Sequence, residues 1–92
     1  MAAIQKGEGK FFVGEDPDHP LAEITFREHD HLVVEHTYVS EELRGQGMAA
    51  KLVGKVADYA REEQKKVKAE CDYAKKKLHA HPEYHDVLLE RD

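Results

Sequence analysis

A glycine-containing segment at residues 40–49 carries the backbone chemistry best suited to bind an anion. It reads Ser-Glu-Glu-Leu-Arg-Gly-Gln-Gly-Met-Ala and separates a strand-like run from a helix-like run. Glycines at a strand-to-helix turn let backbone N–H groups converge, and the positive end of the helix dipole lies behind them. Gly45 and Gly47 would leave room there for a phosphate or pyrophosphate. The alternative is an ordinary glycine-containing helix start. A P-loop is excluded because no Gly-Lys-Ser/Thr follows.

Cys71 is the sole cysteine of the chain, so it cannot form an internal disulfide or a thiolate-rich zinc site. It is either a small core residue or a reactive thiol. His79, His81 and His85 resemble a metal cluster only by their number, because Pro82 interrupts their spacing and no carboxylate motif accompanies them. We therefore expect no physiological metal site.

The charge of the chain limits its partners. Nineteen acidic residues against 14 basic ones give a net charge of -5, which argues against a nucleic-acid-binding module. The balance reverses locally, where the following lysines lie within 13 residues: Lys65, Lys66, Lys68, Lys75, Lys76 and Lys77. This run is either a solvated face or a basic rim for a phosphorylated ligand.

The length of 92 residues indicates one domain, residues 1–92, with a single core. No apolar run exceeds three or four residues. A membrane span needs about 20 residues and a signal-peptide core roughly 7–15, so we expect neither, and no membrane partner. These features predict a cytoplasmic protein.

Two-residue alternation in the first half predicts three strands, at residues 10–14, 21–27 and 32–39, joined as an antiparallel meander. In the third of these, strict alternation places Leu32, Val34, His36 and Tyr38 on one face. Val33, Glu35, Thr37 and Val39 would lie on the other.

The second half has helical periodicity. Apolar residues recur at three- and four-residue steps from Gly47, which predicts a helix of about four or five turns. Residues 67–71 then read as a buried strand that completes a crossover and lies parallel to the strand before it. Asp72 is suited to cap a short helix through Leu78, and Pro82 to begin another. The predicted fold class is α+β, with a three-stranded meander, a long helix, a fourth strand parallel to the third, and short C-terminal helices.

The segment Arg44–Ala49 resembles the Arg/Gln-x-x-Gly-x-Gly/Ala signature of the GCN5-related N-acetyltransferases, in the same position between a strand and a long amphipathic helix. Three further segments are similar to a subfamily of very small, YjdJ-like members: His36–Val39, Cys71–Ala74 and His81–Tyr84. The resemblance extends over roughly residues 5 to 90.

This resemblance implies that the co-substrate is acetyl-CoA. The loop backbone would hold the pyrophosphate, and the pantetheine arm would lie between splayed strands at residues 32–39 and 67–71. The residues expected to contact the cofactor are Val39, Arg44, Gly45, Gln46, Gly47, Met48, Ala49, Lys75 and Lys76.

Acetyl transfer to an amine needs a base and a proton donor for the departing thiolate. Alternation allows only one of Glu35 and His36 to face the cofactor, and we favour His36 as the base. Tyr73 is the candidate donor to the CoA sulfur, and Cys71 the candidate acetyl acceptor in a two-step route. Core roles for all three are the alternatives.

Two functions are therefore consistent with the sequence. The first is a probable N-acetyltransferase acting on an unidentified amine, in a small molecule or a protein. The second is a non-catalytic CoA-binding or protein-interaction module that keeps the cofactor cleft without an acceptor pocket.

Overall fold

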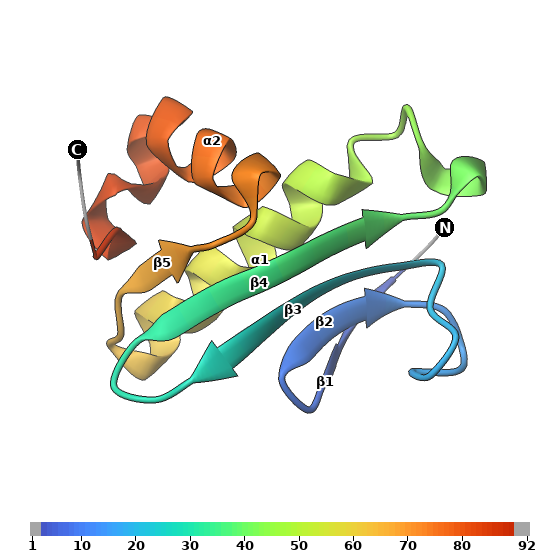
Figure 1. Ribbon diagram of the computed structural model, residues 1–92, viewed down its shortest axis with the longest axis horizontal. Coiled ribbons are helices and arrows are strands. Elements are labelled where there is room, and N and C mark those ends of the chain that lie inside the picture. The colour runs from blue at the N-terminus through green and yellow to red at the C-terminus, as the bar shows by residue number, and fades with distance from the viewer. Residues whose placement is uncertain (1–2, 90–92) are drawn as a thin grey trace.

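A computed structural model describes residues 3–89. One five-stranded sheet has the strand order β1-β2-β3-β4-β5, and α1 and α2 pack on the same face of it (Figure 1). The strands are β1 (Ile4–Gly7), β2 (Lys10–Val13), β3 (Ala22–Glu28), β4 (Leu32–Val39) and β5 (Val67–Ala69). The helices are α1 (Met48–Glu63) and α2 (Asp72–Ala80), with short 3-10 helices η1 (Glu41–Leu43) and η2 (Pro82–Val87).

The predicted α+β fold is confirmed, including the parallel pairing of β4 with β5 on either side of the long helix. The structure adds one strand, β1, which pairs antiparallel with β2 and lengthens the meander to four strands. No residue of β1 is buried. The strand therefore lacks the hydrophobic alternation that identifies a half-buried strand in a sequence.

The core lies between the sheet and the two helices. Helix α1 contributes Met48, Leu52, Val53, Val56, Ala57 and Ala60, which recur at helical spacing and are all buried. The strands supply alternating residues from Phe11 to Val34, and α2 adds Ala74 and Leu78. Each fully buried Leu, Ile or Val contributes about 1.5–3 kcal/mol, so this layer fixes α1 against the sheet.

A β-bulge in β4 corrects the predicted assignment of faces. Val34 pairs with Phe26 and His36 with Thr25, so Glu35 is an extra residue opposite β3. One extra residue reverses the alternation that follows it. Leu32 and Val34 face the helices, but beyond the bulge His36 and Tyr38 are exposed. The prediction that these four residues share a face is wrong.

The same bulge places Glu35 and His36 together on the outer face, where alternation had separated them. The Glu35 carboxylate lies 3.1 Å from Nε of Arg27, whose partner in the ladder is the outward-facing Val33. Thr37 pairs with the buried Ile24 and so faces the helix side instead.

Strands β4 and β5 pair only over a short stretch, from Leu32–Val34 to Val67–Ala69. A last hydrogen bond joins the amide of Glu70 to the carbonyl of Val34 at 2.8 Å. Beyond that bond β4 continues to Val39 while the chain turns away into α2 (Figure 1). The predicted divergence of these strands therefore begins at the bulge.

The C-terminal helices differ from prediction in one detail. The residue that precedes α2 as its N-cap is Cys71, and Asp72 is the first helical residue, so Asp72 is not the cap. Pro82 begins η2 as predicted. Arg61 of α1 holds η2 in place through a two-pronged contact with Asp86, at 2.9 and 3.0 Å. Within residues 3–89, no helix combines the length and the apolar character needed to traverse a bilayer.

Candidate cofactor site

The loop between β4 and α1 presents backbone donors at a helix start. Gly45 and Gly47 have φ values of 84° and 72°, in the left-handed region that favours glycine. Gly47 is the N-cap of α1, no side chain caps the helix, and its first turn contains no acidic residue. The first N–H groups and the positive end of the dipole are therefore available to an anion.

A hollow of about 440 Å³ opens over this loop. Its walls come from the end of β4, the loop, the start of α1 and the first turn of α2. The lining residues are Val39, Leu43, Arg44, Gly45, Gly47, Met48, Ala49 and Tyr73. The space beside both glycines is open, since an added Cβ would meet nothing within 4 Å at either position.

Six of the nine residues predicted to contact a cofactor line this hollow, and Lys75 and Lys76 do not. Gln46 does not line it, and its side-chain amide donates to the carbonyl of Glu42 at 3.3 Å. Leu43 lines it although the sequence motif gave no reason to choose that residue. Nε of Arg44 donates to the carbonyl of Val39 at 3.3 Å and so ties the loop back to the end of β4.

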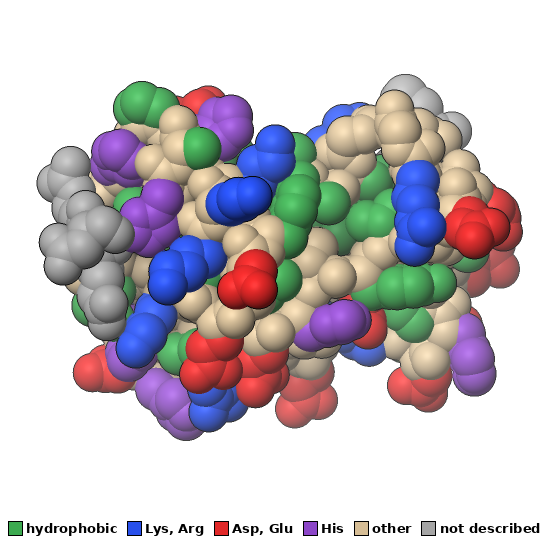
Figure 2. Space-filling model, turned by 45° about the horizontal axis from the view of Figure 1, so that its top comes forward, with side chains coloured by type: hydrophobic (Ala, Val, Ile, Leu, Met, Phe, Trp, Pro, Cys, Tyr) green, Lys and Arg blue, Asp and Glu red, His purple; other side chains and the backbone are tan. Residues whose placement is uncertain are grey.

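A second, larger hollow of about 1050 Å³ adjoins the first along α2. Tyr73 lines both hollows, and Lys75 and Lys76 line the second together with Asp72 and His79. Figure 2 shows a hollowed, partly apolar surface with basic side chains on both of its sides. Of the six lysines in the predicted run, Lys75 and Lys76 line this second hollow, whereas Lys65 pairs with Glu28 and Lys66 donates to the carbonyl of Asp86.

Cys71 lies where β5 gives way to α2 and contacts Thr37 of β4. Its Sγ and the hydroxyl Oγ1 of Thr37 lie 3.5 Å apart, within hydrogen-bond distance for sulfur. Burial raises the pKa of the Cys71 thiol, but hydrogen bonds from Thr37 and from the backbone N–H groups of Ala74 and Tyr73 outweigh it and hold the pKa below its ordinary value. The thiol at the edge of the cleft therefore ionises more readily than an ordinary cysteine does.

Tyr73 and His36 have different relations to this thiol. Tyr73 lines the hollow, is 38% exposed, and has its pKa raised by burial and by Tyr84, so it stays protonated and is able to donate. His36 lies on the outer face of the sheet, whereas Thr37, which contacts the thiol, faces the helix side. The structure brings Cys71, Tyr73 and Thr37 together and leaves His36 apart.

The C-terminal histidines have contacts of their own. Nε2 of His85 lies 3.0 Å from the carbonyl of His79, and His81 lies 3.3 Å from the carboxylate of Glu83. Among the residues that the structure describes, no group of three or more His, Cys, Asp or Glu side chains is arranged to hold a metal ion.

Comparison with known proteins gives the family. The family model of GCN5-related N-acetyl-transferase matches residues 10–87, which is most of the chain. The chain belongs to the GCN5-related N-acetyltransferase family. The family that Arg44–Ala49 predicted is confirmed.

A solved structure supports this assignment over nearly all of this chain. The chain is similar to a GCN5-like candidate N-acetyltransferase from Staphylococcus aureus, known from a solution NMR structure, with 41% sequence identity and a TM-score of 0.81. The match covers 98% of this chain and 90% of that one. No curated protein matches the sequence.

Two more distant structures share the fold. A ribosomal-protein-alanine N-acetyltransferase from Brucella melitensis biovar Abortus 2308 is 21% identical, with a TM-score of 0.57 over 67% of this chain and 48% of that one. An integron cassette protein from the mobile metagenome of Cole Harbour Salt Marsh is 14% identical, with a TM-score of 0.54 over 90% of this chain and 58% of that one. The chain thus spans about half the length of these larger proteins.

Proposed function

We propose that this acetyltransferase-family protein binds acetyl-CoA in the hollow over residues 39–49 and transfers the acetyl group to an amine. The observation that carries the proposal is the uncapped start of α1 behind two glycines of positive φ, which opens into a hollow at the divergence of β4 and β5. Members of the family use acetyl-CoA as co-substrate, and these residues fit its anionic and its extended parts.

Each part of acetyl-CoA has a proposed position. The N–H groups from Gly45 to Ala49 hold the pyrophosphate, while Lys75 and Lys76 add a weaker attraction that salt screens. The pantetheine arm lies in the opening where β4 has no β5 partner, which brings the thioester toward Cys71 and Tyr73. Met48 and Ala49 form the apolar wall of this path.

We propose a two-step transfer through Cys71. The thiolate attacks the thioester carbonyl, a bond forms between its sulfur and the acetyl carbon, and the bond from that carbon to the CoA sulfur breaks. The departing CoA thiolate takes the hydroxyl proton of Tyr73. An amine then attacks the acetyl carbon on Cys71, the bond from that carbon to the Cys71 sulfur breaks, and the Cys71 thiolate is released; the proton that the amine loses passes through water to the Tyr73 phenolate and restores its hydroxyl. Thr37 supports this route because its hydrogen bond favours the thiolate.

His36 has a more remote proposed role as base. Its exposed ring on the outer face allows it to take the amine's proton only through water, because the ring does not lie on the side of Thr37 and Cys71. Glu35, which the bulge places on the same outer face, is bound to Arg27 at 3.1 Å. His36→Ala therefore reduces turnover less than Cys71→Ser does if the covalent route operates.

The covalent step is tested by mass spectrometry after incubation with acetyl-CoA. We expect a mass gain of one acetyl group that hydroxylamine removes and that Cys71→Ser lacks. No adduct, together with amine acetylation undiminished in Cys71→Ser, would contradict the covalent route and leave direct transfer to the amine. If neither adduct nor amine acetylation forms while CoA binds, the protein is a non-catalytic CoA-binding module.

Four further assignments belong to this proposal. We place the chain in the subfamily of very small, YjdJ-like members on the segments His36–Val39, Cys71–Ala74 and His81–Tyr84. We expect a cytoplasmic location, one domain over residues 1–92, and neither nucleic acid nor membrane as a partner. The location is tested by fractionating growing cells and detecting the protein in each fraction with an antibody against it.

A further inference from the structure

Arg27 joins three strands on the outer face of the sheet. It belongs to β3, and its Nε lies 3.1 Å from a carboxylate oxygen of Glu35 in β4. Its Nη2 donates at 3.1 Å to a carboxylate oxygen of Glu70, the residue that directly follows β5. The two contacts use different nitrogens of one planar guanidinium, so both are made at the same time. Arg27 therefore bridges β4 to the end of β5.

Both carboxylates belong to the point where β4 and β5 separate. The last pair of the ladder is Val34 with Ala69. Glu35 is the bulge residue of β4, and the amide of Glu70 donates to the carbonyl of Val34 at 2.8 Å. We call the three residues Val34, Glu35 and Glu70 the fork. Arg27 spans the fork from the outer face of the sheet, because it contacts one carboxylate on each side of it.

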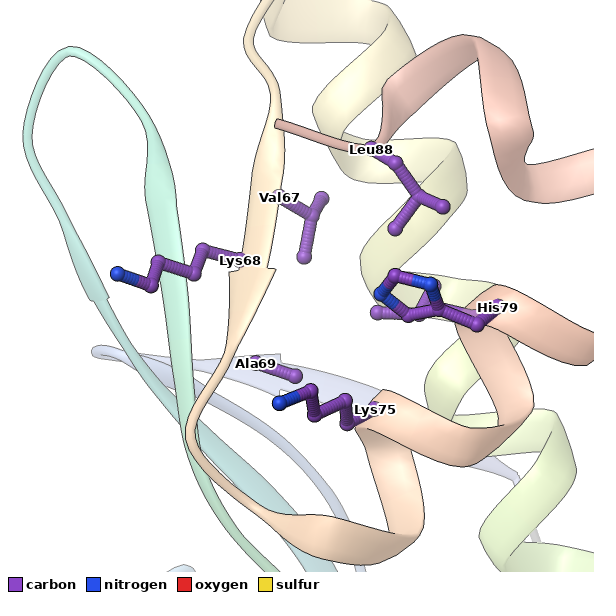
Figure 3. Close-up of a pocket in the computed structure, with 7 residues that line it drawn as sticks. Val67, Lys68, Ala69, Lys75, His79 and Leu88 are labelled. Atoms are coloured by element: carbon purple, nitrogen blue, oxygen red, sulfur yellow. The ribbon is translucent and has the colours of Figure 1, made fainter. Parts of the chain in front are cut away.

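The residues that follow β5 alternate between the two faces of the sheet. Figure 3 shows Val67 turned toward the pocket between β5 and α2, and Lys68 turned away from it to the other face. Glu70 follows Lys68 by two residues and therefore points to the same outer face, where it meets Arg27. Cys71 is the next residue and contacts Thr37 on the helix side. The ion pairs and the thiol contact thus lie on opposite faces of the same fork.

The geometry of the fork determines how far Thr37 lies from Cys71. Thr37 is two residues beyond Glu35, and Cys71 is one residue beyond Glu70, so each lies close in the chain to a carboxylate that Arg27 binds. Sγ and Oγ1 are 3.5 Å apart, and hydrogen bonds weaken steeply when their angles become unfavourable. A small opening of the fork would therefore weaken or break this contact.

We propose that Arg27 is a positioning residue, which holds the fork closed so that Thr37 stays in contact with Cys71. The side chains of Arg27, Glu35 and Glu70 are 49%, 42% and 54% exposed, and ion pairs this exposed contribute little to folding stability. Loss of Arg27 should therefore change the reactivity of the thiol more than the stability of the fold. The inference rests on the proposed function, which makes this thiol the acceptor of the acetyl group.

The test measures alkylation of Cys71 by iodoacetamide in the full chain, without acetyl-CoA. Arg27→Gln removes both ion pairs, so its pH midpoint of alkylation should rise and its rate at neutral pH should fall by about 2–10-fold, as expected for Thr37→Val. Glu35→Gln breaks the bridge at β4 and should give a similar loss. Glu23→Gln is the matched control, because it breaks an ion pair of 3.8 Å elsewhere on the outer face, and it should change neither value.

Two further variants separate positioning from charge. The titratable groups beside the thiol are Glu70, Asp72 and Tyr73, and Arg27 could act merely by neutralising the first of them. Arg27→Lys keeps the positive charge but has one nitrogen in place of the planar guanidinium, so it should lose as much reactivity as Arg27→Gln does. In a Thr37→Val background, Arg27→Gln should cause no further loss, because both substitutions remove the same contact.

Several results would overturn the inference. These are unchanged alkylation in folded Arg27→Gln or Glu35→Gln, full reactivity in Arg27→Lys, and additive losses in the double variant with Thr37→Val. If Arg27→Gln does not fold, Glu35→Gln and Arg27→Lys still decide. Formation of the acetyl adduct is measured separately. If alkylation falls as expected but the unchanged protein forms no adduct, Arg27 positions Thr37 and the covalent route is the part that fails.

Discussion

Replacing Gly47 by glutamate tests whether the loop at the start of α1 holds an anion. Gly47 has a φ of 72°, and an added side chain projects into open space, with nothing within 4 Å of its Cβ. The substitution therefore creates no clash inside the fold. It puts a carboxylate at the mouth of the hollow, where we propose that the pyrophosphate binds.

The substitution has two separate effects, a loss of folding stability and a loss of binding free energy, and each is seen in a different measurement. A non-glycine residue in the left-handed region costs roughly 1–2 kcal/mol of stability, and in a domain of this size each kcal/mol lowers Tm by about 4–8 °C. The loss of a charge-assisted contact costs about 1.5–3 kcal/mol of binding free energy, which is tenfold or more in Kd. Repulsion between the new carboxylate and the pyrophosphate adds to the second cost.

Calorimetric titration with CoA measures the binding term, and thermal unfolding measures the strain. Gly47→Gln is the matched control, because it has the same bulk and the same backbone strain without the charge. We expect the Tm of both variants to fall by the same amount. We also expect Gly47→Glu to bind CoA much more weakly than Gly47→Gln does. A folded Gly47→Glu protein that binds CoA as the unchanged protein does would refute the assignment of this loop.

Three other perturbations have definite expected results. Thr37→Val removes a hydrogen bond that lowers the pKa of Cys71, so the pH midpoint of iodoacetamide alkylation should rise. If the lost bond is worth about 0.5–1.5 kcal/mol, the alkylation rate at neutral pH should fall roughly 2–10-fold. An unchanged pH profile of alkylation would contradict this role of Thr37. The Tyr59 hydroxyl donates to Glu28 at 2.7 Å, which raises the pKa of Tyr59 to about 12, above its unfolded value of about 10. The neutral tyrosine is therefore favoured by folding, and urea unfolding should show a stability advantage over Tyr59→Phe that is full below about pH 10 and shrinks as pH approaches 12; a constant difference would disprove the linkage. Gln at both Lys75 and Lys76 should weaken CoA binding modestly and flatten its dependence on salt, whereas a dependence as steep as that of the unchanged protein argues against the basic rim.

Elements with a buried face were predictable from the sequence. β3 (Ala22–Glu28) and β4 (Leu32–Val39) match their predicted ranges to within a residue at each end, because a half-buried strand imposes alternation on its residues. Helix α1 begins one residue after Gly47 for a similar reason. β1 was missed because none of its residues is buried, and so nothing constrained its pattern.

The site was predictable where its requirements are local. The loop needs glycine at positions of positive φ, so Gly45 and Gly47 identify it within six residues of sequence. The contact between Cys71 and Thr37 joins positions 34 residues apart and depends on the bulge at Glu35. Strict alternation cannot reveal a bulge, and for that reason the sequence pointed to His36 where the structure has Thr37.

The measurement that tests the central claim most directly is a titration of the nitrogen-15-labelled protein with acetyl-CoA. The account predicts saturable binding, with the largest amide shifts in residues 44–49 and smaller ones at Cys71 and Tyr73. These amide shifts should be lost in Gly47→Glu. In Gly47→Gln the same residues should shift once enough acetyl-CoA has been added to saturate the variant. Absence of binding at millimolar acetyl-CoA, or saturable shifts confined to residues outside the hollow, would contradict the account.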